Sequence, residues 1–274
     1  MTTLTFICAA FYLVTAWRLN TRVMVRSSGT EVATESNQLL LALGIAAIIL
    51  HGATIYEGTV TADGLRLGLF NALSLVGLTV AALVLFAVHG KPLDNLGVFV
   101  LPLSALSVLL AWIFPATTGS GADMSIGIQL HALVSIVAYG LLALAALQAV
   151  LVSVQDRWLR AKTSMTRLRA LPPLARQESL LFQLIGAGFF FLSLALVSGT
   201  MFVQDLFAQH LVHKTLLSGV AWIVFGVILL GRWRYGWRGR PVIRWCLTAF
   251  VLLALAYFGA KLVLEEILGR SWSG

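Results

Sequence analysis

The chain has 274 residues, of which 59% are hydrophobic and 11% are charged, and its mean hydropathy is +0.92. This composition gives far more apolar surface than one soluble core can bury, so it excludes a soluble domain and predicts an all-α integral membrane protein. The formal net charge is +8, but Lys and Arg gather in short connectors between apolar runs, which argues against nucleic acid as a partner.

Eight apolar runs are long enough, at about 20 residues each, to cross a hydrocarbon core of about 30 Å as helices. The first run has no positive n-region before it, and Arg18 and Arg22 follow it, so we interpret it as a retained helix rather than a secretion signal. Residues 1–274 are predicted to form a single transmembrane domain. The predicted segments are residues 2–18, 37–57, 67–88, 95–114, 126–153, 178–203, 214–232 and 245–265.

The basic residues predict how these segments cross the membrane. All but four of the 19 Lys and Arg residues lie in the connectors after the first, third, fifth and seventh segments. The positive-inside rule places such connectors in the cytoplasm, so both termini are expected on the extracytoplasmic side of a bacterial inner membrane. The longest connector, residues 155–177, is interpreted as an anchor that contacts anionic lipid. The four exceptions are Arg66, Lys214, Lys261 and Arg270.

Several common motifs are missing from the sequence. Without C-x-x-C-H the chain is not itself a c-type cytochrome, and it has no C-x-x-C redox pair. Walker A, G-x-S-x-G and H-E-x-x-H motifs are also missing. Cys8 and Cys246 are expected at different depths of the membrane, so no disulfide is expected between them.

Four of the five histidines are predicted near the extracytoplasmic face. His51 and His131 fall at similar depth in the second and fifth segments, while His210 and His213 lie just before the seventh, on one side of that stretch if it is helical. Imidazole is the commonest side chain for holding a haem iron or a transition metal. The alternatives are a hydrogen bond between helices for the intramembrane pair and an idle exposed ring for the other pair. His89 is expected to be an ordinary solvated residue on the cytoplasmic side.

Other polar residues repeat at helical spacing around these rings. Each repeat places its members on one face of a segment, which is expected to point inward because polar groups are costly in lipid. The alternatives are hydrogen bonds that only join helices and, for Lys214, a chain that extends to the membrane surface. The residues are Ser135 and Tyr139 after His131, Ser218 and Trp222 after Lys214, and Asn71 and Ser74 in the third segment.

Longer stretches carry a family resemblance. They are H-A-L-V-S-I-V-A-Y-G-L-L from His131, S-G-T-M-F-V-Q-D-L-F-A-Q-H-L-V-H-K from Ser198, the A-W-I-V-F-G run after it, and G-W-R-G from Gly236. These stretches resemble the cytochrome c assembly family, which includes the CcsA-type haem exporters and the HemX-like and YpjD-like inner membrane proteins. L-R-L-G-L-F-N-A-L-S from Leu65, with His51 before it, is most similar to the YpjD branch. The resemblance covers nearly the whole chain.

The resemblance implies a membrane protein that binds haem through histidines. His131 matches the family's outer histidine, which precedes an S-x-x-x-Y pattern, and His51 resembles its intramembrane histidine. Together they imply bis-histidine ligation of a b-type haem iron, with polar neighbours that set the tautomers. The other candidate binding residues are Ser135, Tyr139 and Asn71 as such neighbours, Lys214 for a haem propionate, and His210 and His213.

One departure from the family limits what the resemblance implies. CcsA-type proteins carry a tryptophan-rich W-G-x-x-W-x-W-D segment outside the membrane, where haem is presented to apocytochrome, and no outer connector of this chain contains it. Ligation of haem to cysteine is therefore not implied. The expected function is haem handling as a carrier, sensor or accessory, with another membrane protein or assembly component as a possible partner, and the sequence leans away from an enzyme.

Two other functions stay open at this point. In the first, His51, His131 and His210 bind a divalent metal ion or move protons in a membrane transporter or transporter subunit. The inner halves of the segments offer few acidic residues for such a path. In the second, the chain is a cofactor-free structural subunit of a membrane complex, and its histidines only join helices.

Overall fold

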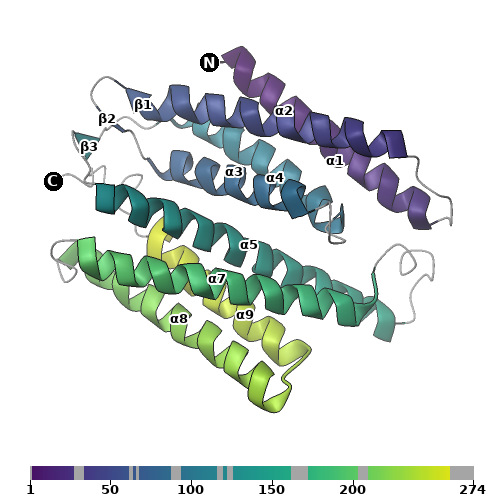
Figure 1. Cartoon of the computed structure of the whole chain (residues 1–274), viewed down its shortest axis with the longest axis vertical. Coiled ribbons are helices and arrows are strands. Elements are labelled where there is room, and N and C mark those ends of the chain that lie inside the picture. The colour runs from purple at the N-terminus through teal and green to yellow at the C-terminus, as the bar shows by residue number, and fades with distance from the viewer. Residues whose placement is uncertain are drawn as a thin grey trace. The chain divides into compact units, whose positions relative to one another are not determined.

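The computed structural model describes residues 2–27, 34–61, 64–65, 68–87, 94–115, 120–121, 126–161, 172–202 and 209–259. Within these ranges eight helices are long and apolar enough to cross a membrane, which confirms the predicted number (Figure 1). The side of the membrane on which the termini lie stays a prediction. The helices are α1 (Thr2–Ser27), α2 (Thr34–Thr59), α3 (Leu69–Ala87), α4 (Asp94–Ile113), α5 (Ile126–Arg160), α7 (Leu174–Phe202), α8 (Gln209–Tyr235) and α9 (Arg240–Ala254), and a π-helical turn, η1 (Leu255–Gly259), continues α9.

Several helices extend beyond the apolar segments that predicted them. α5 continues to Arg160 rather than to residue 153, and α9 begins at Arg240 rather than at residue 245. Hydropathy marks only the part of a helix inside the hydrocarbon, whereas the backbone hydrogen bonds continue through good helix formers such as Arg, Leu and Gln. α8 begins at Gln209, so the backbones of His210 and His213 are helical.

The described parts of the connectors between the first four helices and α5 contain three strands of two residues each. They are β1 (Val60–Thr61), β2 (Gly64–Leu65) and β3 (Ser120–Gly121), antiparallel in the order β1-β2-β3. Val60 pairs with Leu65, and Leu65 pairs with Ser120. Strands this short carry no period that a sequence could display, so the sequence predicted none, and the all-helical class is unaffected.

The helices group into two compact units, each of which is described by itself. Unit 1 comprises residues 1–122 and 158–172 and contains α1 to α4 with the small sheet. Unit 2 comprises residues 123–157 and 173–274 and contains most of α5 together with α7, α8, α9 and η1. The organisation as a single domain stays a prediction.

In unit 1, α1 packs on α2 and α4, and α3 packs on the same two helices, so the four helices close a ring. α3 and α4 approach closely, because the Ser104 hydroxyl donates to the Gly77 carbonyl oxygen at 2.9 Å and a Cβ on Gly77 would collide with Ser107 Oγ. Lipid gives no hydrophobic force between helices, so small residues and short polar contacts must hold them. The buried small residues of this core include Ala9, Ala16, Ala47, Ala81 and Ala105.

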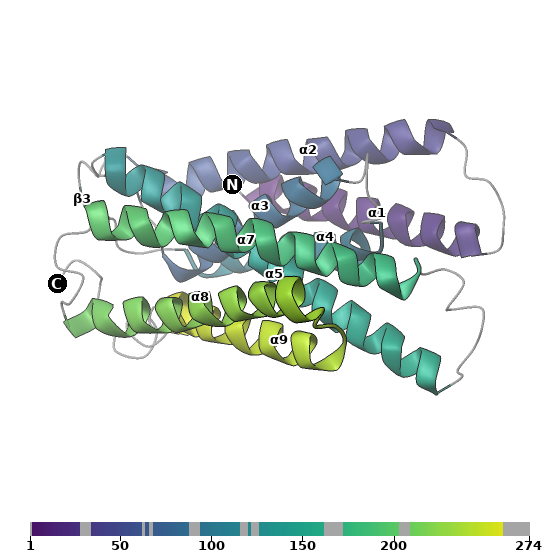
Figure 2. The same cartoon turned by 60° about the horizontal axis from the view of Figure 1, so that its bottom comes forward.

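Unit 2 contains α7, α8 and α9, which Figure 2 labels. Its core lies around Phe225 of α8, whose side chain is fully buried. Gly188 of α7 gives α5 room, since a Cβ there would lie 2.6 Å from Leu142 Cδ2. The buried Gln148 of α5 donates its amide to the Gln177 carbonyl oxygen of α7 at 3.1 Å and also to the Gln177 side-chain oxygen. An apolar core and one amide pair therefore join α5 to α7.

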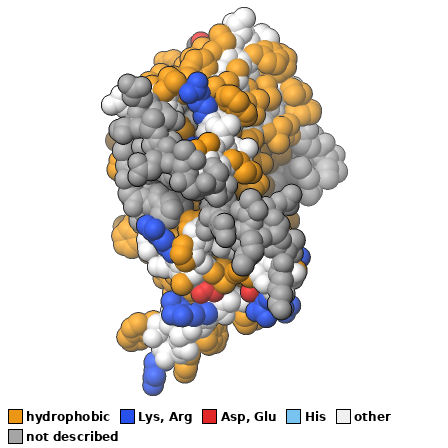
Figure 3. Space-filling view, turned by 90° about the vertical axis from the view of Figure 1, so that its right-hand side faces the viewer, with side chains coloured by type: hydrophobic (Ala, Val, Ile, Leu, Met, Phe, Trp, Pro, Cys, Tyr) orange, Lys and Arg blue, Asp and Glu red, His pale blue; other side chains and the backbone are white. Residues whose placement is uncertain are grey.

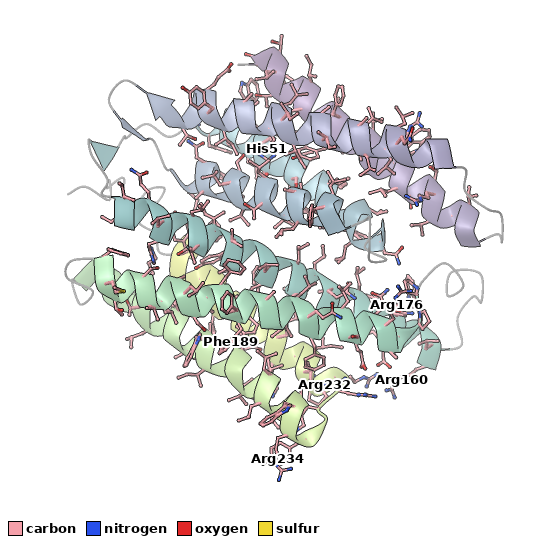
Figure 4. All side chains as sticks on the ribbon, viewed as in Figure 1. His51, Arg160, Arg176, Phe189, Arg232 and Arg234 are labelled. Atoms are coloured by element: carbon pink, nitrogen blue, oxygen red, sulfur yellow. The ribbon has the colours of Figure 1, made fainter. Side chains whose placement is uncertain are left out.

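Arginines gather at one end of unit 2, where α8 ends and α7 and α9 begin. Figure 4 labels Arg176, Arg232 and Arg234 in this region, and Figure 3, which faces the right-hand side of Figure 1, shows Lys and Arg side chains with few Asp or Glu side chains. Arg240, at the start of α9, forms an ion pair with α5, since its Nε lies 3.2 Å from Asp156 Oδ2. The grouping follows the basic connectors that the sequence places on one side of the membrane.

Candidate functional site

His51 of α2 lies fully buried in unit 1, at the position labelled in Figure 4. Its Nδ1 shares a hydrogen bond of 2.9 Å with the Tyr12 hydroxyl of α1, and its Nε2 shares one of 2.8 Å with the Ser74 hydroxyl of α3. A neutral imidazole has one N–H donor and one nitrogen acceptor, so these two partners use both. We call these three residues the Tyr12–His51–Ser74 network.

This network restricts what His51 can bind. An iron ligand must offer a nitrogen lone pair, and in the structure each ring nitrogen already faces a hydroxyl. His51 can therefore coordinate a metal only when Ser74 or Tyr12 gives up its hydrogen bond. The geometry also matches the alternative in which a buried histidine joins helices.

We expect His51→Ala to lower the stability of the protein in detergent by about 1–3 kcal/mol, because a buried hydroxyl without a partner costs that much. The change removes the partner of both the Tyr12 and the Ser74 hydroxyls. Thermal melting followed by circular dichroism checks this. The control is Tyr56→Ala, which removes an exposed side chain of the same helix. Equal melting temperatures for the two variants would show that the hydrogen bonds of the network do not stabilise the protein.

His131 of α5 lies in unit 2 and is only half-buried. Its Nδ1 lies 3.0 Å from the Ser198 hydroxyl of α7, and a Cβ on the next residue, Gly199, would lie 3.1 Å from its Cε1. The ring also lies within hydrogen-bond reach of the Ala195 carbonyl oxygen of α7, and Nε2 has no side-chain partner among the described residues. His131 thus differs from His51, because only one of its nitrogens faces a side-chain hydroxyl among the described residues.

Tyr139, two turns after His131 on α5, has its hydroxyl engaged elsewhere. It donates to the Leu253 carbonyl oxygen of α9 at 2.8 Å, just before the helix changes to the π-helical turn. Its ring packs edge-on against Phe258. Ser135, one turn after His131, is half-buried and makes no side-chain hydrogen bond with a described residue. Tyr139 therefore holds α5 to the end of α9.

Lys214, near the start of α8, lies on the same unit as His131. Its Nζ is 4.9 Å from the centre of the Tyr257 ring in η1, a cation–π distance. Its charge also acts on the His131 ring. A cation and an imidazole with an available nitrogen thus occur at the same end of unit 2.

The remaining candidates are placed as follows. Asn71 of α3 is buried in unit 1 and donates its amide to the Gly58 carbonyl oxygen at 3.4 Å, so it ties α3 to the end of α2. The side chains of His210 and His213 lie outside the described residues, as do His89 and Lys261. Where the structure describes the chain, no group of three His, Cys, Asp or Glu residues is placed to hold a metal ion.

Three residues of these arrangements were missed in the sequence. Tyr12 lies in an apolar first segment, and nothing in its surroundings indicates that it faces His51. Ser198 and Gly199 open the S-G-T stretch that carries the family resemblance, and this stretch was the available signal. A serine in a membrane helix usually bonds its own backbone, so its contact with His131 was not expected.

Comparisons with known proteins identify the relatives of this chain. The family described as "Cytochrome C assembly protein" matches residues 39–268. The inner membrane protein YpjD of Escherichia coli K12 is 30% identical over 232 residues, which cover 83% of this chain and 85% of that protein. An uncharacterized 28.8 kDa protein of Azospirillum brasilense is 36% identical over 157 residues, covering 57% and 58%. The cytochrome c biogenesis protein CcsA of Mesostigma viride is 26% identical over 97 residues, covering 35% and 32%. No solved structure matches the chain.

Proposed function

The chain belongs to the cytochrome c assembly protein family, and we propose that it is a haem-binding member of it that acts in haem handling as a carrier, sensor or accessory. It is a multi-pass inner membrane protein with eight membrane-crossing helices among the described residues. The absence of the tryptophan-rich segment from the sequence supports a role other than attaching haem to cysteine.

The available Nε2 of His131 is the observation that carries this proposal. Metal-binding histidines almost always use their other ring nitrogen in a hydrogen bond that orients the ring, and His131 Nδ1 has such a bond with Ser198. The donor set fits a haem, whose iron takes neutral imidazole as an axial ligand. When bound, the haem would supply an iron that coordinates or releases an axial ligand.

Lys214 extends the proposal to the acidic edge of a haem. A propionate is a carboxylate, and a lysine amine near the end of a membrane-crossing helix is suited to pair with it. Tyr257 keeps the Lys214 amine over its ring, so the cation is held before any ligand arrives. Ser135, which makes no side-chain hydrogen bond to described residues, is proposed as a further polar contact.

We also propose His51 as a residue that would hold a haem iron, with a condition that the structure adds. Its Nε2 must exchange the Ser74 hydroxyl for the iron, while Tyr12 keeps Nδ1 and orients the ring. The loss of one neutral hydrogen bond costs about 1 kcal/mol, which a metal–imidazole bond can offset. A low-spin, histidine-ligated b-type haem is the expected form.

The purified protein tests the proposal directly. We expect haem added to the protein in detergent to give a Soret band that saturates at one haem per chain, with the spectrum of a low-spin, histidine-ligated iron. Detergent micelles without protein provide the control. A spectrum that equals that of haem in empty micelles would contradict haem binding, and bound divalent metal without a Soret band would favour the transporter alternative.

A further inference from the structure

We propose that Ser198 and Gly199 are positioning residues for His131, in that Ser198 fixes the ring proton on Nδ1 and Gly199 lets the ring lie against α7 with Nε2 free. The inference rests on the proposed function, because it assigns to these residues the preparation of the haem ligand. It concerns the state of the ring before haem binds, so it can be tested separately.

The direction of the hydrogen bonds carries the first step. The Ser198 hydroxyl lies 3.0 Å from the Ala195 carbonyl oxygen, to which it donates. A hydroxyl has one proton, and a carbonyl oxygen can only accept, so the Ser198 proton is used in that bond. With that proton on the Ala195 carbonyl oxygen, the imidazole is the donor in the 3.0 Å contact between His131 Nδ1 and Ser198 Oγ, and the same carbonyl oxygen also lies within hydrogen-bond reach of the ring.

The ring tautomer follows from this direction. Neutral imidazole carries a single proton, and a proton on Nδ1 leaves Nε2 with its lone pair. Nε2 is the nitrogen that has no side-chain partner among the described residues. The serine therefore selects the form of His131 in which the available nitrogen is also the one able to bind a metal.

Gly199 supplies the second step, which is orientation. A Cβ at this position would lie 3.1 Å from His131 Cε1, 3.6 Å from Nδ1 and 3.9 Å from Nε2. The first distance is tighter than ordinary van der Waals contact, so a methyl group would push the edge of the ring away from α7. Two consecutive residues of α7 thus act on His131. Ser198 fixes the ring proton through a hydrogen bond, and Gly199 fixes the position of the ring because it has no side chain.

His51 and its partners show what this arrangement avoids. Each nitrogen of that ring faces a hydroxyl, so its single nitrogen lone pair is already used in a hydrogen bond and becomes available only after a rearrangement. At His131, Nδ1 faces the Ser198 hydroxyl, whereas Nε2 faces no hydroxyl among the described residues. The difference between the rings depends on their hydrogen-bond partners, because the side chain is the same.

Nitrogen NMR on the haem-free protein tests the tautomer. With ¹⁵N-labelled histidine, we expect His131, assigned by the loss of its signals in His131→Ala, to show a protonated Nδ1 and an unprotonated Nε2. Ser198→Ala should shift both nitrogens toward a mixture of tautomers, and Ser198→Thr, which keeps the hydroxyl, should restore them. Ser193→Ala is the matched control, because Ser193 lies on the same helix, donates to the Phe189 carbonyl oxygen and accepts from Trp222.

Haem titration of the same variants tests the consequence. Outer partners of a metal ligand typically change affinity about 10–100-fold, so we expect Ser198→Ala and Gly199→Ala to weaken haem binding by that factor. Ser193→Ala and Ser198→Thr should bind as the unmodified chain does.

Separate results would overturn separate ideas. A protonated Nε2 in the unmodified protein, or equal haem affinity in Ser198→Ala, contradicts the positioning role and leaves the proposed function intact. A correct tautomer together with no haem binding by the unmodified chain contradicts the function and leaves the positioning role intact. Melting temperatures of all variants identify any that fail to fold.

Discussion

His131→Ala is expected to weaken haem binding more than about 100-fold and to remove the low-spin Soret band. The change takes away the ligand nitrogen itself, which should exceed the 10–100-fold effect typical of an outer partner. Fold is expected to survive, because the ring is half-buried and makes one side-chain hydrogen bond. Titration with haem, followed by absorbance, gives the affinity.

Added imidazole gives this test a readout that a structural role would not move. The alanine leaves space for a free imidazole to take the place of the ring, so millimolar imidazole should restore part of the low-spin spectrum. His89→Ala is the control histidine, since the sequence places it on the cytoplasmic side, and it should leave the spectrum unchanged. An unaltered spectrum in His131→Ala would rule out the ligand assignment.

His51→Ala separates the two roles open to His51. A second axial ligand predicts a shifted Soret band in protein that remains folded, because the iron loses its sixth ligand. An unchanged band in folded protein would contradict ligation and leave only the role of joining α1, α2 and α3. Ser74→Ala adds a useful comparison, since it frees His51 Nε2 and should strengthen haem binding if His51 is a ligand.

Phe225→Ala is expected to destabilise the protein by about 3 kcal/mol, at the low end of the range for buried Phe→Ala changes. Phe225 is fully buried at the centre of the unit 2 core, so its removal leaves a cavity between helices. The low end applies because lipid is as apolar as the core, and the loss is mainly one of packing contacts. Chemical or thermal unfolding in detergent measures the effect.

Phe190→Ala is the matched control for this change. Phe190 lies on α7 of the same unit and is 59% exposed, so we expect a change within about 0.5 kcal/mol, as for other substitutions away from a core. Equal losses in the two variants would contradict the placement of the core around Phe225. Haem titration of both variants also shows whether packing in unit 2 affects the His131 end.

The helices were predictable from the sequence because membrane crossing requires long apolar runs, which hydropathy detects directly. Their ends were less predictable. α5 continues to Arg160 because polar residues that form helices well extend it beyond the apolar run. The change from α9 to η1 depends on backbone hydrogen bonds, which no pattern of side chains indicates. The strands at Val60 and Gly64 were too short to leave a period.

The candidate residues were predictable, but their partners were not. His51 and His131 attracted notice as intramembrane imidazoles, which are rare and costly. The hydroxyl facing His51 Nδ1 is 39 residues away, on Tyr12, and the one facing His131 is 67 residues away, on Ser198. Such pairs depend on how helices rotate against one another, and a single sequence with a period of 3.6 leaves that rotation open. Tyr139 was placed on the correct helix, but its bond to Leu253 could not be foreseen for the same reason.

The Tyr12–His51–Ser74 network also bears on the order in which the protein is made. Tyr12 and His51 lie on α1 and α2, which leave the ribosome before α3, the helix that carries Ser74. Before α3 is inserted, a hairpin of α1 and α2 can therefore give the His51 ring a hydrogen-bond partner only at Nδ1. When α3 is inserted, Ser74 completes the hydrogen bonding of His51. This hydrogen bond favours the packing of α3 against the hairpin over its separation from the hairpin in the bilayer.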